Sequence, residues 1–166
     1  MSVNTEIERK FLIRRPDDQF LLSLPHTEIL QTYLKNDQPG VTERVRKRGL
    51  DGKYVYTHTA KTRIDPMSCI EDESEITEEE YLLVLSRADS SKAPVQKMRC
   101  LIEKGGFTFE IDVYPFWKKQ AVMEVELPSE QAEFIIPETV TVLREVTGNR
   151  AYSNTRIAAC IPDEDL

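Results

Sequence analysis

The sequence predicts an α+β fold in which about eight antiparallel strands close into a β-barrel or pack as a curved sheet, with short helices at the flanks. About eight segments alternate apolar and polar residues with a period of two, which is typical of strands that bury one face. The tight-turn sequences Asp51-Gly52 and Gly105-Gly106 separate two pairs of these segments and indicate hairpins. A barrel of about this many strands has an interior that can hold one small ligand.

The expected strands follow one another along the chain at residues 6–13, 28–35, 41–48, 53–61, 71–76, 95–104, 107–114 and 121–127. Helices are expected after Pro16, from Thr77, after Pro128 and over residues 147–159. Pro16 suits a first helical position, and Thr77 with Glu80 three residues later forms a capping-box pattern. Residues 62–69 are expected to form a loop.

The composition favours one soluble, cytoplasmic domain spanning residues 1–166. Charged residues make up 31% of the chain and the net charge is −7, which argues against general binding to nucleic acid or to an anionic membrane. Cys69, Cys100 and Cys160 have no metal-ligand spacing, so we expect small buried residues in a reducing compartment. No apolar run has the length of a membrane span, and no signal-peptide pattern is present.

The first expected strand places a particular set of charges on one face. Side chains two residues apart on a strand share a face, so Glu6, Glu8 and Lys10 lie together. Taken alone, this segment favours an ordinary solvent-exposed strand face, since surface charge is common.

The same kind of charged face recurs on later strands. Pairs of acids share a face at Glu73 and Glu75, Glu110 and Asp112, and Glu124 and Glu126. Cations share a face at Arg44, Arg46 and Arg48, and at Lys97 and Arg99, with Lys61 standing singly. Two interpretations follow: cross-strand ion pairs on an exposed sheet, or a mixed cavity that binds a polyanion together with a divalent metal. Carboxylates suit Mg²⁺ or Mn²⁺, and arginine and lysine suit phosphate oxygens. The recurrence over many strands favours the cavity.

This ordered series resembles the signature of the CYTH superfamily, the triphosphate tunnel metalloenzymes. The likeness begins at Glu6-x-Glu8-x-Lys10. It continues nearly end to end through Gln31-x-Tyr33-Leu34, Glu43-Arg44-Val45-Arg46, Lys61, Glu73-x-Glu75, Lys97-x-Arg99, Glu110-Ile111-Asp112-Val113, Glu124-Val125-Glu126 and Glu145-Val146-Thr147-Gly148 to Tyr152-Ser153-Asn154. The resemblance implies an eight-stranded antiparallel β-barrel, a tunnel with a charged lumen.

The resemblance also implies a role for each matching residue. The expected ligands of Mg²⁺ or Mn²⁺ are Glu6, Glu8 and Glu126, joined by Asp112 and Glu124, with supporting acids at Glu73, Glu75 and Glu110. The expected triphosphate clamp is Arg44, Arg46, Lys61, Lys97 and Arg99. Lys10 and Tyr33 resemble a dyad that positions or deprotonates water. For Tyr33, a packed strand aromatic with a hydrogen-bonded hydroxyl is an equal alternative.

Other polar residues carry weaker expectations. Arg48, Lys53 and Glu103 are expected at exposed strand ends, and His26 and His58 match no family position. The chain lacks the basic residue that the resemblance would place just before Glu73. The helix expected at residues 147–159 would plug one end of the tunnel, from which Arg150 or Arg156 could reach the lumen.

The expected activity is metal-dependent hydrolysis of inorganic tripolyphosphate to pyrophosphate and phosphate. Alternatives that share the same triphosphate grip are a thiamine or nucleoside triphosphatase and a class IV adenylate cyclase, which converts ATP to cyclic AMP and pyrophosphate. A polyphosphate-binding module without turnover is the alternative that is not an enzyme. The expected partner is a small-molecule triphosphate, with neither nucleic acid nor membrane, and the sequence leaves open whether the chain forms a homodimer.

Overall fold

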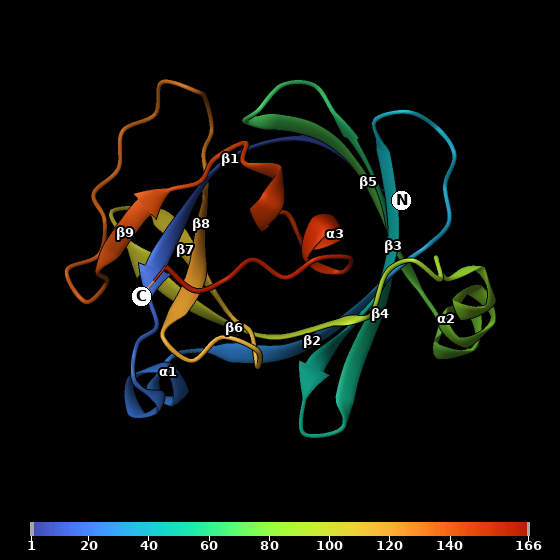
Figure 1. Ribbon diagram of the computed structural model, residues 1–166, viewed down its shortest axis with the longest axis horizontal. Helices are drawn as coiled ribbons and strands as arrows, with labels where there is room; N and C mark the ends of the chain where they lie inside the picture. Colours follow the sequence, from blue (N-terminus) through green and yellow to red (C-terminus); the bar gives the residue numbers. More distant parts are fainter. Residues whose placement is uncertain (1, 166) are drawn as a thin grey trace.

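The structure is a computed structural model that describes residues 2–165 (Figure 1). Within these residues the chain forms nine strands, three α-helices and two 3-10 helices. The strands are β1 (Ser2–Arg14), β2 (His26–Tyr33), β3 (Val41–Leu50), β4 (Lys53–Arg63), β5 (Ser68–Ile76), β6 (Val95–Lys104), β7 (Phe107–Val113), β8 (Gln120–Glu126) and β9 (Val142–Glu145). The helices are α1 (Asp18–Ser23), α2 (Glu78–Val84), η1 (Leu85–Arg87), η2 (Arg150–Tyr152) and α3 (Asn154–Ile157).

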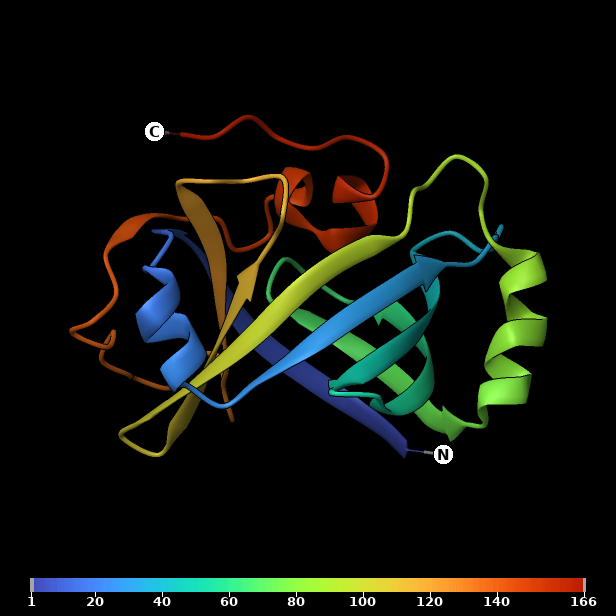
Figure 2. The same cartoon turned by 90° about the horizontal axis from the view of Figure 1, so that it is seen from below.

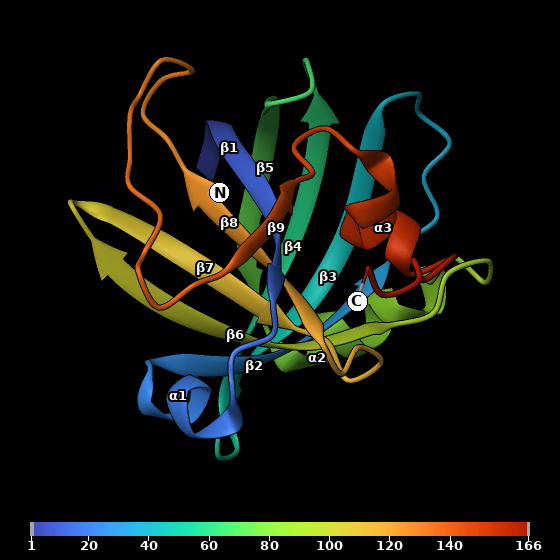
Figure 3. The same ribbon diagram turned by 60° about the vertical axis from the view of Figure 1, so that its left-hand side comes forward.

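Strand β1 closes the sheet into a barrel because its two halves pair in different ways. Residues 2–7 pair antiparallel with β5, and residues 8–14 pair antiparallel with β8. The order β5-β4-β3-β2-β6-β7-β8-β1, with the added β5–β1 pairing, is therefore a closed ring of eight strands, which confirms the expected barrel. Closure leaves few unpaired strand edges. The short strand β9 lies along β1 as an addition to the ring (Figure 3).

The two expected hairpin turns are present. Asp51 and Gly52 have φ values of 53° and 79°, and Gly105 and Gly106 have values of 60° and 82°. Positive φ at both central residues defines the type I′ turn, whose twist matches that of paired strands. All eight expected strands are confirmed with ends that differ by at most four residues, the largest difference being at the start of β1, and β5 begins at Ser68 inside the segment expected to be a loop.

Two of the expected helices form and two do not. Thr77 accepts a hydrogen bond from the Glu80 amide, and Glu80 bonds back to the Thr77 amide, so the capping box of α2 is confirmed. The helix expected after Pro128 is wrong: residues 128–140 form turns and irregular structure. There the ring of Phe134 packs edge-on against Phe11 and Phe109, so tertiary contacts hold the segment in place.

The single helix expected over residues 147–159 is also wrong. The chain forms η2 and α3 instead, separated by Ser153 in an extended conformation with φ −72° and ψ 144°. The Asn149 side chain caps η2 by accepting from the Ala151 amide, and the Ser153 side chain caps α3 by accepting from the Arg156 amide. Two such local caps start two short turns in place of one continuous helix.

Apolar side chains cover the outside of the barrel and fill one end of its interior. One cluster, which includes Leu21 of α1 and Met123 of β8, lies under α1 and residues 128–140. A second joins Tyr81 of α2 to Val45 of β3. Helices α1 and α2 lie on opposite flanks (Figure 2). A third, which we call the plug cluster, closes the interior at one end and consists of Leu12, Tyr33, Val95, Tyr114, Trp117, Val122, Val146, Tyr152, Ile157 and Ala158.

No helix within the described residues is long and apolar enough to cross a membrane. The three cysteines carry free thiols; Cys69 and Cys100 are buried as expected, whereas Cys160 is exposed, contrary to expectation.

Candidate active site

The lumen contains a cavity of about 290 Å³, walled by strands of the barrel and by Ser153 with the first residues of α3. Its lining residues are Glu6, Glu8, Lys10, Tyr33, Gly40, Thr42, Arg44, Arg46, Arg48, Lys61, Arg63, Cys69, Glu71, Glu73, Arg99, Glu110, Glu124, Glu126, Ser153, Asn154 and Thr155. The period of two places these side chains inside, because their strand neighbours pack into the outer apolar layer. Most of the residues expected in the site therefore meet in one cavity.

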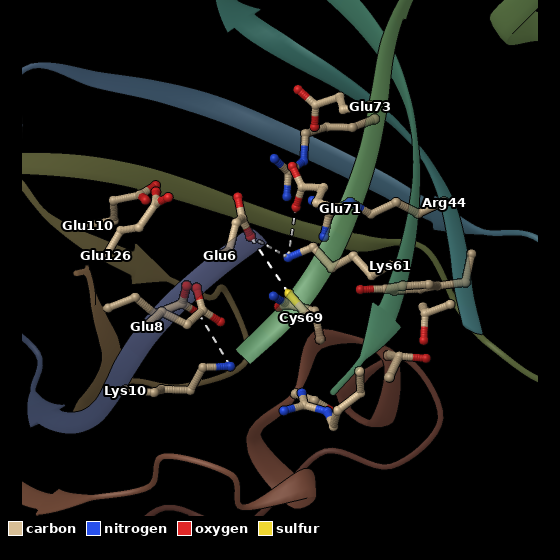
Figure 4. Close-up of a pocket in the computed structure, with 18 of the residues that line it drawn as sticks. Glu6, Glu8, Lys10, Arg44, Lys61, Cys69, Glu71, Glu73, Glu110 and Glu126 are labelled. Atoms are coloured by element: carbon tan, nitrogen blue, oxygen red, sulfur yellow. Dashed lines mark hydrogen bonds and ion pairs between the residues drawn. The ribbon is translucent and has the colours of Figure 1, made fainter. Parts of the chain in front are cut away.

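The carboxylates gather around β1 and β8. Antiparallel pairing sets Glu8 opposite Glu126 and Lys10 opposite Glu124. Figure 4 shows Glu110 and Glu126 side by side, with Glu6 turned toward Lys61. The Glu6 carboxylate lies 3.5 Å from the Lys61 ammonium. Acids from three strands thus face the same part of the lumen.

Crowding of these acids shifts their ionisation. The charge of Glu124 and burial raise the pKa of Glu8 to about 7. Burial, opposed by Lys61 and aided by the nearby Glu71, raises the pKa of Glu6 to about 7. Burial alone would also raise the pKa of Glu124, but neighbouring cations, Lys10 first among them, lower it to about 2. A proton or a metal cation would relieve the repulsion at Glu6 and Glu8.

The donors are of the kind that Mg²⁺ and Mn²⁺ prefer, since they are carboxylate oxygens facing a polar cavity. Among residues 2–165, however, no group of three or more His, Cys, Asp or Glu side chains is gathered closely enough to hold a metal ion. The acids instead form pairs, such as Glu8 with Glu124 and Glu6 with Glu71. The donor chemistry fits a divalent cation, and binding one would require these side chains to turn toward it.

Three arginines form the opposite, basic wall. Arg44, Arg46 and Arg99 are each 8% exposed, although a guanidinium is rarely buried without full pairing. Arg44 Nε is the one buried side-chain polar atom without a hydrogen-bond partner among the described residues. Burial and the neighbouring Arg44 and Arg99 lower the pKa of Arg46 to about 9. Cations held this closely favour an anionic ligand between them.

Lys10 and Tyr33 both line the cavity, but among the described residues they share no hydrogen bond. The Lys10 ammonium lies 3.3 Å from a Glu124 oxygen and donates over 3.3 Å to the backbone oxygen of Tyr152. The Tyr33 hydroxyl accepts a hydrogen bond from Gln31. The two residues thus line the same cavity with separate partners, and their expected role as a dyad stays a prediction.

The structure leaves Lys97, Asp112 and Glu75 outside the cavity lining. Asp112 is 1% exposed, and the Lys97 side chain is 0% exposed. The Asp112 carboxylate accepts from Lys97 over 2.7 Å and from two nitrogens of Arg99 over 2.8 and 2.9 Å. These two cations hold the pKa of Asp112 well below its usual range, against the effect of burial. Asp112 therefore anchors Arg99 from behind the wall, whereas Glu75 lies exposed near the end of β5.

Three charged lining residues were not among the expected site residues. Arg48 was expected at an exposed strand end, which is wrong: it is half-buried and donates to Thr27 Oγ1 over 2.9 Å. Glu71 lies 3.1 Å from Lys61 and shares a face with Glu73. Arg63, two residues after Lys61, adds a further cation from the end of β4. Glu71 already lay on the face of Glu73 in the strand expected at 71–76, and the period of two could have predicted Arg63 had the strand expected at 53–61 been extended to Arg63.

The remaining polar residues lie away from the cavity lining. Lys53 and Glu103 are exposed, as expected. Arg150 and Arg156 are exposed, and Ser153, Asn154 and Thr155 face the lumen in their place. His26 lies 2.7 Å from the Leu24 backbone oxygen, and His58 lies 2.5 Å from Glu43, so both have structural partners.

Solved structures resemble this fold over most of its length. The inorganic triphosphatase NE1496 is 30% identical, with 95% of this chain and 97% of that protein covered at a TM-score of 0.59. A candidate adenylate cyclase from Bacillus halodurans is 17% identical, with 78% and 84% covered at a TM-score of 0.58. A candidate adenylyl cyclase from Hippeastrum, described as having a dominant triphosphatase activity, is 13% identical, with 74% and 80% covered at a TM-score of 0.52. No protein-family model matches the chain, and no curated protein does.

The fold is a closed antiparallel barrel, a tunnel whose lumen sets carboxylates against buried arginines. The similarity to an inorganic triphosphatase, at 30% identity over 95% of this chain, identifies the protein family. The chain belongs to the CYTH superfamily, the triphosphate tunnel metalloenzymes.

Proposed function

We propose that this protein is a divalent-metal-dependent triphosphatase that hydrolyses inorganic tripolyphosphate to pyrophosphate and phosphate. The observation that carries the proposal is the buried Arg44 Nε, which lacks a hydrogen-bond partner among the described residues and belongs to a side chain that lines the cavity. A buried donor without a partner costs free energy, and a phosphate oxygen would remove that cost. The whole-length similarity to an inorganic triphosphatase supports the same activity.

The arginines would bind the phosphate chain. Arg44 and Arg46 extend from β3 and Arg99 from β6, so they can contact phosphoryl groups from two sides. Their charge would also stabilise the charge that develops on the transferred phosphoryl group. Asp112 would keep Arg99 in position while the phosphoryl group is transferred.

Glu6, Glu8, Glu124 and Glu126 would hold Mg²⁺ or Mn²⁺ against the other side of the substrate. When bound, the metal supplies Lewis acidity toward phosphoryl oxygens and toward water. Water adds to a terminal phosphorus, the bond to the bridging oxygen breaks, and pyrophosphate leaves. Lys10, held between Glu124 and the Tyr152 backbone, would orient the attacking water by hydrogen bonding.

The lining favours an inorganic substrate over one with a ring-bearing tail. Among the described residues that line the cavity, the single aromatic is Tyr33, which is 3% exposed. A nucleoside or thiamine group would have little aromatic surface on which to stack. A thiamine or nucleoside triphosphatase and a class IV adenylate cyclase remain the alternatives, together with a polyphosphate-binding module. The cytoplasmic location, the oligomeric state and the choice between Mg²⁺ and Mn²⁺ stay predictions.

The test is phosphate and pyrophosphate release from tripolyphosphate, thiamine triphosphate and ATP, with Mg²⁺ or Mn²⁺ and with cyclic AMP measured alongside. Metal-dependent phosphate release from tripolyphosphate, lost with a chelator and weak for the other substrates, is expected. Cyclic AMP with pyrophosphate from ATP would instead establish a cyclase. Tight binding of tripolyphosphate without release in either metal would establish the binding module.

A further inference from the structure

Gln31 lies between two functional side chains but does not itself line the cavity. It is 0% exposed and faces the interior from the centre of β2. Arg46 is directly opposite it on β3, and Tyr33 is two residues along the same face. A buried glutamine needs hydrogen-bond partners for both its amide oxygen and its amide nitrogen, so those partners show which way the amide is turned.

The contacts allow one orientation of the amide. Arg46 donates to Gln31 Oε1 from Nε over 3.3 Å and from Nη2 over 2.9 Å. Because a guanidinium has only donors, it must face the oxygen end of the amide. The nitrogen end then faces Tyr33, and Gln31 Nε2 donates to the Tyr33 hydroxyl oxygen over 3.0 Å.

This orientation determines what the Tyr33 hydroxyl can do. Its oxygen already accepts from Gln31, so its own hydrogen points elsewhere. Among the described residues the Tyr33 hydroxyl donates no hydrogen bond, and Tyr33 lines the cavity. A phosphoryl oxygen of a bound triphosphate would be such an acceptor.

We propose that Gln31 is a positioning residue that turns the Tyr33 hydroxyl hydrogen toward a phosphoryl oxygen of the substrate while it holds Arg46 in the clamp. The inference rests on the proposed function. Tyr33 then acts as a hydrogen-bond donor to the substrate, and Gln31 ties that donor to a clamp arginine.

Two substitutions separate the two ends of the amide. Gln31→Glu keeps an acceptor for Arg46 but removes the donor to Tyr33, whose hydroxyl would then donate to the new carboxylate. Gln31→Met is of similar length and removes both bonds. The matched control is Gln96→Glu, the same chemical change at an exposed position on the neighbouring strand β6, outside the cavity.

The assay is tripolyphosphate hydrolysis, with kcat and KM measured for each variant alone and combined with Tyr33→Phe. Gln31→Glu should lower kcat/KM by about tenfold, mainly through kcat, because one hydrogen bond to a charged group is lost. Gln31→Met should also raise KM, because Arg46 loses the hydrogen-bond acceptor that keeps it in position. In the Tyr33→Phe background, Gln31→Glu should change kcat/KM by less than about twofold, because the group through which it acts is gone. Gln96→Glu should behave as the wild type does.

Independent, multiplying effects of Gln31→Glu and Tyr33→Phe would overturn the inference, as would unchanged kinetics in either single variant. A fall in melting temperature without the kinetic coupling would mark Gln31 as purely structural. If the wild type hydrolyses no triphosphate, the proposed function fails. The same combinations, measured by calorimetry of tripolyphosphate binding, then decide the inference: the two losses of affinity should fail to add, and additive losses would refute it.

Discussion

Replacing Asp112 with asparagine should destabilise the protein strongly, since it removes the anion from a buried ion pair. The Asp112 carboxylate faces Lys97 at 2.7 Å and Arg99 at 2.8 Å, and the Lys97 side chain is 0% exposed. Breaking a buried pair leaves an uncompensated cation and costs about 3–5 kcal/mol. For a chain of this size, that loss corresponds to a fall in melting temperature of roughly 6–20 °C.

Urea unfolding followed by tryptophan fluorescence would measure the change in free energy. The chain has one tryptophan, Trp117, and it is 3% exposed, so its emission should report loss of the folded state. The matched control is Glu126→Gln, the same chemical change at an exposed cavity acid. The control should stay within about 1 kcal/mol of the wild type, as is usual for exposed sites, but should lose metal-dependent activity.

The outcome separates two roles for Asp112. The family resemblance implies a metal ligand, whereas the contacts describe an anchor for Arg99. If Asp112→Asn unfolds at the same urea concentration as the wild type and loses only the stabilisation given by Mg²⁺ or Mn²⁺, then the ion-pair argument is refuted and Asp112 is a ligand.

Three further predictions concern the cavity and the outer wall. Glu6→Gln and Glu8→Gln should each reduce phosphate release to about one hundredth or less, because a carboxylate proposed to hold the metal is lost. Folding raises the pKa of each carboxyl to about 7, so the charged carboxylate destabilises the folded wild type above pH 7. Neither substitution should therefore lower the melting temperature above pH 7. Near-normal turnover would exclude both residues from the site. Arg46→Ala should raise KM and lower kcat, together by about tenfold or more, and an effect on melting temperature alone would mark Arg46 as structural. Glu43→Gln should destabilise the fold by roughly 1–3 kcal/mol at pH 7. Burial alone would raise the pKa of Glu43, but the bond with His58 outweighs it and lowers that pKa. The stability that Glu43 contributes is therefore present above pH 4.5 and is lost as the pH falls through the lowered pKa. A difference in stability between wild type and Glu43→Gln that persists in acid would contradict this.

Much of the barrel could be predicted because its signals are local. Asp51-Gly52 and Gly105-Gly106 adopt positive φ readily, so the hairpins follow from their sequence. Thr77 and Glu80 lie three residues apart and cap α2 without help from elsewhere in the chain. The segments after Pro128 and Thr147 were mispredicted because side chains distant in sequence, or two competing caps, decide their conformation.

Whether an inward-facing side chain lines the cavity depends on its position along the barrel axis, and the local sequence does not set that position. Lys97 and Asp112 point inward like Arg99 and Glu110, but each is two residues from the plug cluster, at Val95 and Tyr114. They therefore lie where the interior is filled, so Lys97 pairs with Asp112, and Asp112 also holds Arg99. Arg99 and Glu110 lie two residues farther from the plug cluster than Lys97 and Asp112, and they reach the cavity.

The sequence by itself determined which side chains share a face, because successive residues of a strand alternate sides. That alternation brought Glu6, Glu8 and Lys10 together and separated charged faces from apolar ones. Only the tertiary structure decided which inward charges meet a ligand and which meet each other. Charges on different strands are joined by register, closure and the plug cluster, which together set the distances over which they act.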